Sequence, residues 1–124
     1  MKKDETRENY LEAIHILSLN KQGVKAIDVA NYLKFARATV SIALKELENE
    51  GYIKFEKYNI FLTAKGLQIA NSIYERHEYI AQLLMHLGVD EKTAYEDSCK
   101  IEHDISQKSF EAIKRITEKT IKRQ

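Results

Sequence analysis

The sequence predicts a mainly α-helical protein with a small β-wing, in which an N-terminal winged helix-turn-helix at residues 1–66 precedes a C-terminal helical domain at residues 67–124. Three observations lead to this prediction. Apolar residues recur at helical spacing along most of the chain, one stretch alternates apolar and polar residues, and the chain has no proline and four glycines. Such a composition favours long helices with few sharp turns.

The first half of the chain holds three predicted helices. Residues 5–19 carry an apolar helical stripe, which the polar run at 20–23 ends. A short helix follows at about 26–33. After a brief break a third helix runs over about 37–49, and Gly51 is suited to end it.

A hairpin is expected after the third helix. Tyr52–Glu56 and Asn59–Thr63 both alternate apolar and polar residues, and only Lys57 and Tyr58 separate them. Two short helices with a tight turn, followed by a two-stranded hairpin, make a winged helix-turn-helix. The second helix of such a domain enters the major groove of DNA, so this half of the chain predicts DNA binding.

The second half of the chain predicts three more helices. A long one runs over about 64–87, and its apolar stripe is wider than one neighbouring helix needs. Asp90 is a good N-cap for a helix over about 91–103, and Ser106 can cap a final helix. Because three such helices cannot close a core alone, we expect a homodimer.

The composition bounds the class of protein. With 124 residues, of which 44% are hydrophobic, the chain can bury one core or two small ones that share an interface. No apolar stretch is long enough to span a bilayer, the start lacks the apolar run of a signal peptide, and one cysteine cannot form an internal disulfide. We therefore expect a cytoplasmic protein with no membrane partner.

The net charge of +1 is unevenly distributed. Residues 21–67 carry eight basic and five acidic side chains, residues 68–104 carry three basic and eight acidic, and residues 105–124 carry six basic and two acidic. The first of these segments suits a polyanion and the second suits a cation. For the basic tail we favour an ordinary solvated helix face.

The run Cys-Lys-Ile-Glu-His at residues 99–103 is a candidate metal site. In a helix, Cys99, Glu102 and His103 stand at i, i+3 and i+4 and share one face. A thiolate, a carboxylate and an imidazole on one turn suit a divalent ion such as Fe(II), Co(II), Ni(II) or Zn(II). The alternative is a small buried cysteine beside an ordinary polar helix face.

Other residues can add to this site. His77 lies late in the long helix, Glu12 projects from the first helix, and Asn9 lies three residues before Glu12 on the same side. The alternatives are a half-buried, hydrogen-bonded histidine and a solvated carboxylate. His15 and His86 have no matching neighbours and are expected to be structural or exposed.

Polar residues of the winged domain are placed to contact DNA. The hydroxyls of Thr39 and Ser41 can bond phosphates or base edges, and Arg37 can reach a guanine or a phosphate. The candidate DNA-binding residues are Lys25, Arg37, Ala38, Thr39, Ser41, Lys45 and Lys57. The alternative is a helix-turn-helix kept only for protein contacts.

The order of motifs along the chain resembles a known family. The chain has E-N-Y-L-E-A-I in the first helix, A-T-V-S in the second helix of the winged domain, Y-E-R-H in the long helix, and G-V-D-E and C-K-I-E-H after it. Over about residues 5–117 this order resembles the diphtheria-toxin-repressor family of metal-dependent transcriptional regulators, which includes the manganese transport regulators. The resemblance implies that residues 67–124 form a metal-binding and dimerisation domain.

The resemblance also implies a set of metal ligands. Family members bind metal between the first helix, the long helix and the C-x-x-E-H helix. The matching residues are Asn9, Glu12, His77, Cys99, Glu102 and His103. Manganese-type members have Asp and Glu at the first and fourth of these positions, and iron-type members have Met and Cys. Cys99 therefore matches the iron type, whereas Asn9 matches neither.

The implied cofactor is Fe(II) or Mn(II). Iron-type members continue into an SH3-like third domain, so the two-domain layout of this chain resembles the manganese type. A thiolate ligand nevertheless moves the preference from Mn(II) towards softer ions, and we place Fe(II) slightly ahead. Co(II), Ni(II) or Zn(II) are expected to bind in vitro.

The function expected from the sequence is repression of metal-uptake genes. Metal locks a homodimer into a form that reads a palindromic operator in double-stranded DNA, with half-sites about 34 Å apart. One alternative is a winged-helix regulator that senses a small organic ligand without metal. Another is a small metallohydrolase, but the sequence has no evident nucleophile and base for it, and we expect no enzyme.

Overall fold

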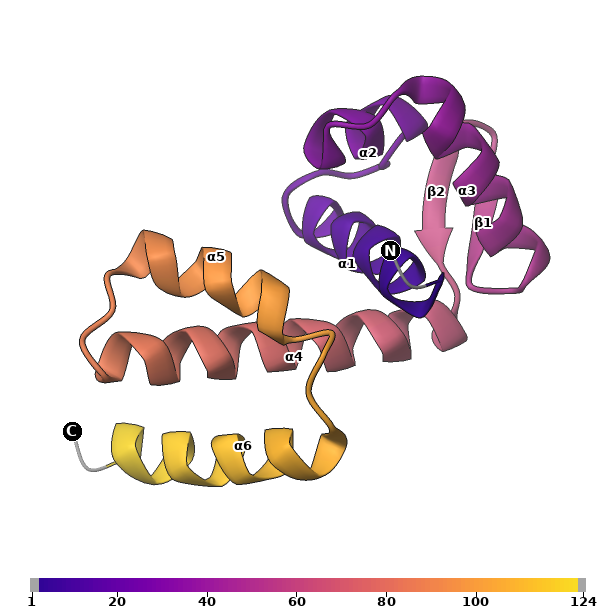
Figure 1. The fold of residues 1–124 in the computed structure, drawn as a ribbon. Coiled ribbons are helices and arrows are strands. Elements are labelled where there is room, and N and C mark those ends of the chain that lie inside the picture. Colours follow the sequence, from indigo (N-terminus) through magenta and orange to yellow (C-terminus); the bar gives the residue numbers. More distant parts are fainter. Residues whose placement is uncertain (1–2, 123–124) are drawn as a thin grey trace. The chain divides into compact units, whose positions relative to one another are not determined.

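The computed structural model describes residues 3–122 and the side chains of residues 5–120. These residues form six α-helices and one two-stranded antiparallel sheet (Figure 1). In chain order the elements are α1 Lys3–Asn20, α2 Ala26–Leu33, α3 Arg37–Asn49, β1 Ile53–Glu56, β2 Asn59–Leu62, α4 Ala64–His86, α5 Glu91–Ile101 and α6 Gln107–Lys122. The mainly helical fold with a small β-wing is thereby confirmed.

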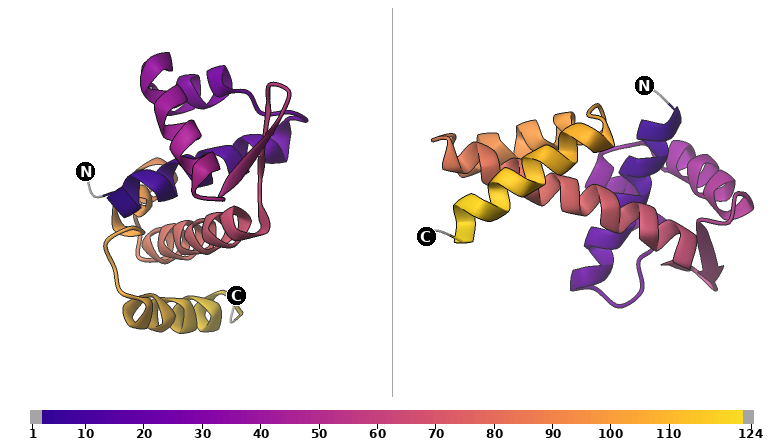
Figure 2. Two further views of the ribbon diagram at one scale, coloured as in Figure 1. Left: turned by 90° about the vertical axis from the view of Figure 1, so that its right-hand side faces the viewer. Right: turned by 90° about the horizontal axis from the view of Figure 1, so that it is seen from below.

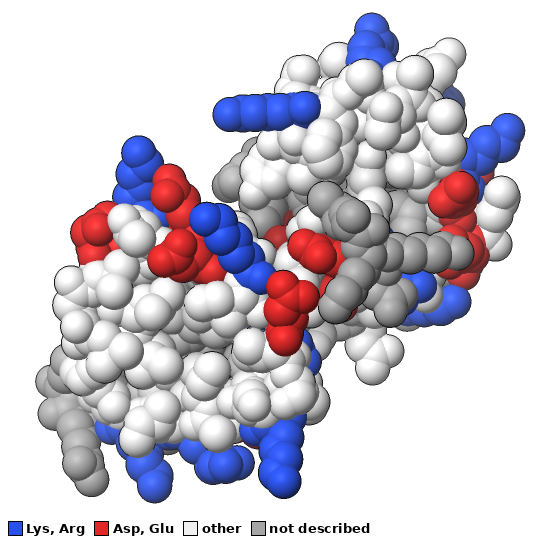
Figure 3. Space-filling view, in the orientation of Figure 1, with Lys and Arg blue, Asp and Glu red and all other residues white. Residues whose placement is uncertain are grey.

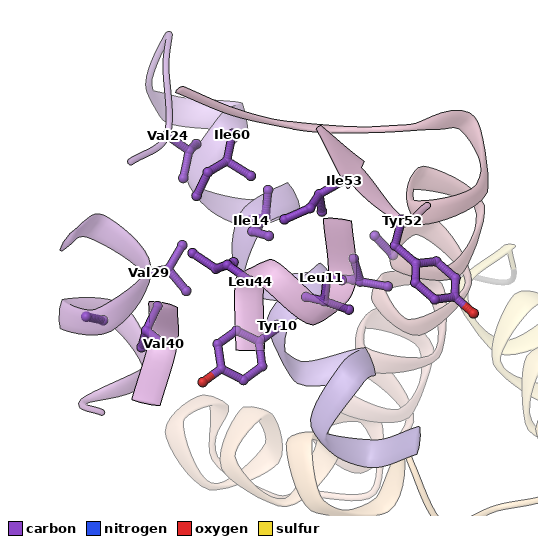
Figure 4. Close-up of a cluster of buried hydrophobic side chains, with 13 residues drawn as sticks. Tyr10, Leu11, Ile14, Val24, Val29, Val40, Leu44, Tyr52, Ile53 and Ile60 are labelled. Carbon is purple, nitrogen blue, oxygen red and sulfur yellow. The ribbon is translucent and has the colours of Figure 1, made fainter. Parts of the chain in front are cut away.

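The chain divides into two compact units, Met1–Asn71 and Ser72–Gln124, and the division falls within α4. The N-terminal unit is built around one apolar core, to which α1, α2, α3 and the hairpin all contribute (Figure 4). Leu11 and Ile14 of α1 are fully buried in it, opposite Leu44 of α3. Each such side chain contributes about 1.5–3 kcal/mol by leaving water, so α1 is part of the core of the N-terminal unit.

The end of α3 and the start of α4 are joined through one threonine. Gly51 follows α3 with a left-handed φ of 86°, which favours glycine, and Tyr52 N then donates to Leu47 O at 3.0 Å, as in a Schellman motif. The Thr63 hydroxyl bonds the carbonyls of Gly51 and Tyr52 and accepts from Gly66 N at 3.2 Å, so it also caps α4.

The wing is a short hairpin with a two-residue connection. Ile53 pairs with Leu62 and Glu56 with Asn59, and Lys57 takes a left-handed φ of 58° in the turn. Ile60 N donates to Val24 O at 2.7 Å, so the segment before α2 forms a bridge to the hairpin. The sequence did not predict this bridge.

In the C-terminal unit α5 and α6 flank α4 on different sides (Figure 2). The predicted N-caps are both present: Asp90 accepts from Thr93 N at 3.0 Å, and Ser106 Oγ accepts from Ser109 N at 3.1 Å. No helix of the described residues is both long and apolar enough to cross a membrane.

One helix is shorter than expected. The sequence predicts a helix through His103, but α5 ends at Ile101 and His103 lies in the turn that follows. The guanidinium of Arg76 on α4 donates to the carbonyls of Glu102 and Ile105 at 3.1 and 3.0 Å. These contacts from another helix satisfy carbonyls of the turn, which is why the chain leaves the helix here.

The close approach at Gly66 gives a test of the N-terminal unit. A Cβ at Gly66 would stand 2.0 Å from Tyr52 O, a backbone atom, so Gly66→Ala should lower the free energy of unfolding by about 2 kcal/mol or more. Urea unfolding measures the change. Gly51→Ala is the control: nothing lies within 4 Å of its Cβ, and the left-handed φ alone costs roughly 1–2 kcal/mol. A Gly66→Ala protein as stable as the wild type would contradict this packing.

Candidate metal centre and nucleic-acid interface

The candidate metal centre lies between α4 and the end of α5. Because α5 runs back along α4, the last turn of α5 comes opposite the middle of α4 (Figure 1). His77 stands on α4, Cys99 in the last turn of α5, and Glu102 at the C-cap of α5. The backbone of Glu102 keeps helical angles, so the spacing from Cys99 to Glu102 survives the early end of the helix.

Three ligand-type side chains converge here. His77 Nδ1 lies 2.9 Å from Glu102 Oε2 and 3.7 Å from Cys99 Sγ. One donor atom from each of the three residues lies within 4.8 Å of the other two. The structure thus brings together three of the residues that the sequence singles out, although His77 and Cys99 are 22 residues apart in the chain.

His103 joins the same carboxylate from the other side. Its Nε2 lies 3.3 Å from Glu102 Oε1, and the two side chains are 2% and 0% exposed. Glu102 therefore stands between two imidazoles, with one oxygen towards each.

The surroundings of His77 hold its imidazole in the charged form. Burial lowers the pKa of His77, but its hydrogen bonds to Cys99 and Glu102, together with their charges, outweigh burial and raise the pKa to about 10. At neutral pH the imidazolium therefore donates to Glu102 Oε2 from Nδ1.

Several supporting residues were missed by the sequence reasoning. Ser98 is fully buried, its hydroxyl donates to His77 O at 2.5 Å, and the same oxygen lies 3.3 Å from His77 Nδ1. The ring of Tyr95 lies 5.2 Å from that of His77, and its hydroxyl donates to Glu78. Arg76 fixes the turn that carries Glu102. The spacing of Ala94 and Ser98 on α5 could have revealed the buried serine, but no sequence signal points to the role of Arg76.

The donor set fits a divalent transition ion. Glu102 Oε1 is buried and makes no hydrogen bond within the described part of the chain, although His103 Nε2 lies 3.3 Å from it. A buried carboxylate oxygen in this state is costly unless a cation or a proton meets it. Sulfur, imidazole nitrogen and carboxylate oxygen together suit Fe(II), Co(II), Ni(II) or Zn(II), with Mn(II) favouring the oxygens.

Asn9 and Glu12 stand one turn apart on α1, in the N-terminal unit. Their side chains therefore project to the same side of that helix, as the sequence predicts. Their part in metal binding stays a prediction. His15 follows Glu12 by three residues and is partly buried, which lowers its pKa.

In the N-terminal unit α3 presents the predicted polar face to solvent. Val40, Leu44 and Leu47 anchor it in the core. The five candidate residues of α3, which are Arg37, Ala38, Thr39, Ser41 and Lys45, are all exposed. Lys25 is the N-cap residue of α2 and Lys57 forms the tip of the wing, and both are exposed. Their contacts with DNA stay predictions.

Charged side chains separate within the C-terminal unit. In Figure 3 acidic side chains gather over the region of α5, and Lys and Arg line the edge formed by α6. The acidic side accords with the excess of acidic residues at 68–104. The basic side chains of α6 that the structure describes lie at the surface, as expected for an ordinary solvated helix face.

The chain matches two family models. Residues 4–60 match the N-terminal DNA-binding domain of iron-dependent repressors, and residues 63–121 match their metal-binding and dimerisation domain. Both models concern metal-dependent repressors, so they give no support to a sensor of organic ligands.

Individual relatives agree with these matches. An uncharacterized HTH-type transcriptional regulator of Methanocaldococcus jannaschii is 37% identical over 115 residues, which cover 90% of this chain and 92% of that protein. The HTH-type transcriptional regulator MntR of Bacillus subtilis is 35% identical over 107 residues, which cover 86% of this chain and 75% of the relative.

Among solved structures, the manganese regulator SloR matches with a TM-score of 0.77 and 28% identity over 89% of this chain and 52% of that one. The chain thus spans about half the length of SloR. A hypothetical protein from Sulfolobus solfataricus matches with a TM-score of 0.68 and 25% identity over 90% of this chain and 86% of that one.

The protonation of His77 can be tested in the metal-free protein. We expect the folded protein to keep the imidazole proton until about pH 10, and the urea-unfolded chain to release it near 6.5. Because the folded pKa is the higher one, the charged pair stabilises the fold fully below pH 6.5 and loses this effect as the pH rises through 10. NMR titration of the ring signals, with and without urea, measures both values.

Glu102→Gln is the control for this titration, since it removes the negative charge and should lower the folded pKa of His77. A folded pKa at or below 6.5 in the wild type would contradict the charged pair.

Proposed function

The chain belongs to the iron-dependent repressor family of metal-dependent transcriptional regulators, the family of the diphtheria toxin repressor and the manganese transport regulators, and from that premise we propose that it represses metal-uptake genes when Fe(II) or Mn(II) is plentiful. The observation that carries the proposal is the cluster of His77, Cys99 and Glu102, in which one buried carboxylate oxygen makes no hydrogen bond within the described part of the chain. Members of this family are transcriptional regulators and not enzymes. We propose a cytoplasmic homodimer that reads a palindromic operator and has no membrane partner.

We propose His77, Cys99, Glu102 and His103 as ligands from the C-terminal unit. Glu102 would offer Oε1, which makes no hydrogen bond within the described part of the chain, to a bound divalent ion. His77 must release its proton and Cys99 must act as thiolate, so metal affinity should rise with pH. The sulfur ligand favours Fe(II) slightly over Mn(II).

We propose that Glu12, with Asn9, completes the ligand set from α1. The support for this step is the family resemblance of the segment E-N-Y-L-E-A-I at residues 8–14. Ligands from both units would tie the DNA-binding unit to the dimerisation unit in one arrangement. Two recognition helices of a dimer would then be held about 34 Å apart, one turn of DNA.

Regulation then follows from a shift in populations. The metal-free dimer samples several spacings of its recognition helices, and only one of them fits both half-sites. Metal binding that favours this spacing raises DNA affinity, and by linkage DNA raises metal affinity by the same factor.

For the DNA contacts we propose a division of roles. Lys25 and Lys57 neutralise phosphates from the start of α2 and from the wing tip. Thr39, Ser41 and Arg37 lie in the first turns of α3, where a recognition helix approaches base edges.

The metal dependence is the first test. Duplexes are selected from a random library, and their affinity for the protein is measured anaerobically at fixed salt. The protein should bind them about five- to 150-fold more tightly with Fe(II) or Mn(II) than after the metal has been removed with a chelator. Equal affinity in both states would contradict the proposed switch. Addition of Mg(II) to the chelated protein controls for a non-specific effect of a divalent cation on the DNA, and the affinity should stay at the chelated value.

Cys99→Ala tests the ligand set. The side chain of Cys99 is exposed, so its removal should leave the unfolding free energy within about 0.5 kcal/mol of the wild type. Loss of a ligand should weaken metal binding at least roughly tenfold and reduce metal-dependent DNA binding to match.

Lys100→Ala is the matched control, because Lys100 is the exposed neighbour of Cys99 in the same turn and carries no ligand atom for a cation. Isothermal titration calorimetry compares the metal affinities of the two variants. Unchanged metal affinity in Cys99→Ala would remove Cys99 from the ligand set.

A further inference from the structure

Ile42 on α3 is a large apolar side chain that stays mostly in solvent. It is 65% exposed and lies roughly half a turn around the helix from the buried stripe of Val40 and Leu44. Ala38 and Lys45, which lie about one turn before and after it on the same outer face, are exposed as well. Ile42 is therefore at the part of α3 that faces furthest from the core.

Exposure alone assigns no role, because single exposed apolar residues are common on protein surfaces. The distribution of charge along α3 adds a second observation. Arg37 and Lys45 bound a stretch without acidic residues, and Glu46, Glu48 and Glu50 follow it. A polyanion is therefore attracted to the first part of α3 and repelled by its end, and Ile42 lies within the first part.

The chemistry of the major groove supplies a partner for such a side chain. Thymine presents a C5-methyl group there, which apolar side chains contact, whereas the other bases present polar groups. The β-branched side chain of isoleucine has one strongly preferred χ1 rotamer in a helix, so little freedom is lost on contact. Ala38 and Ser41 beside it are short and leave room for a base edge to approach.

We propose that Ile42 is a specificity-determining residue that selects a thymine in each operator half-site through apolar contact with its C5-methyl group. The proposal rests on the proposed DNA binding by α3 and adds to it the base that one residue reads.

The test compares thymine with deoxyuridine, which lacks only the C5-methyl group. Duplexes are selected from a random library with the full chain loaded with Mn(II) or, anaerobically, with Fe(II), and each thymine of a selected duplex is then replaced in turn. For the wild type we expect one thymine per half-site whose replacement weakens binding about three- to tenfold. In Ile42→Ala the same replacement should change the affinity by less than about 1.5-fold, because the contact is already lost.

Leu19→Ala is the matched control. Leu19 is an aliphatic residue of α1 that is 59% exposed, and its removal should leave the wild-type response to deoxyuridine. Circular dichroism and urea unfolding should show both variants folded as the wild type, since neither side chain belongs to the core.

The outcomes separate this proposal from the function on which it rests. Metal-dependent binding without any deoxyuridine effect, or with an effect that persists in Ile42→Ala, would overturn the role of Ile42 and leave the repressor function standing. A wild-type protein that selects no duplex with either metal would overturn both.

Discussion

The pairing of Glu102 with His77 is the constraint on which the C-terminal unit depends. A carboxylate taken out of water needs partners, and Glu102 finds an imidazole at each of its oxygens. This pairing fixes the end of α5 against the middle of α4. Arg76, one residue before His77, then holds the backbone carbonyls of the turn that carries Glu102, so neighbouring residues of α4 secure both the side chain and its backbone.

The N-terminal unit is held together mainly by the hydrophobic effect. Its elements are held by burial of apolar side chains from α1, α2, α3 and the hairpin, and the core contains no ion pair among the residues of the cluster. The backbone bond from Ile60 to Val24 adds the hairpin to the helices. Such a unit can present α3 in a fixed orientation with respect to the wing whether or not the other unit holds a metal ion.

Local signals in the sequence predicted most of the elements. The bounds of α2 and α3 are those expected, because an apolar period and nearby turn residues determine both. The caps at Asp90 and Ser106 were also predictable, since an N-cap acts on residues two or three places away. The C-x-x-E-H spacing predicted that Cys99 and Glu102 share a face.

Contacts between distant segments were not predictable in this way. The end of α5 at Ile101 depends on Arg76, which is 26 residues before Glu102 in the chain. The burial of Ser98 and its bond to His77 likewise require α4 and α5 to be packed together. The bridge between Val24 and Ile60 joins segments that no periodicity links.

The residues of the candidate centre differ in their exposure to solvent. Glu102 is closed off from solvent, whereas Cys99 is exposed. An ion that enters or leaves by the sulfur side need not open the packing of α4 against α5. Exchange with the surrounding metal pool would then not require local unfolding, and the occupancy of the site could follow a change in metal supply.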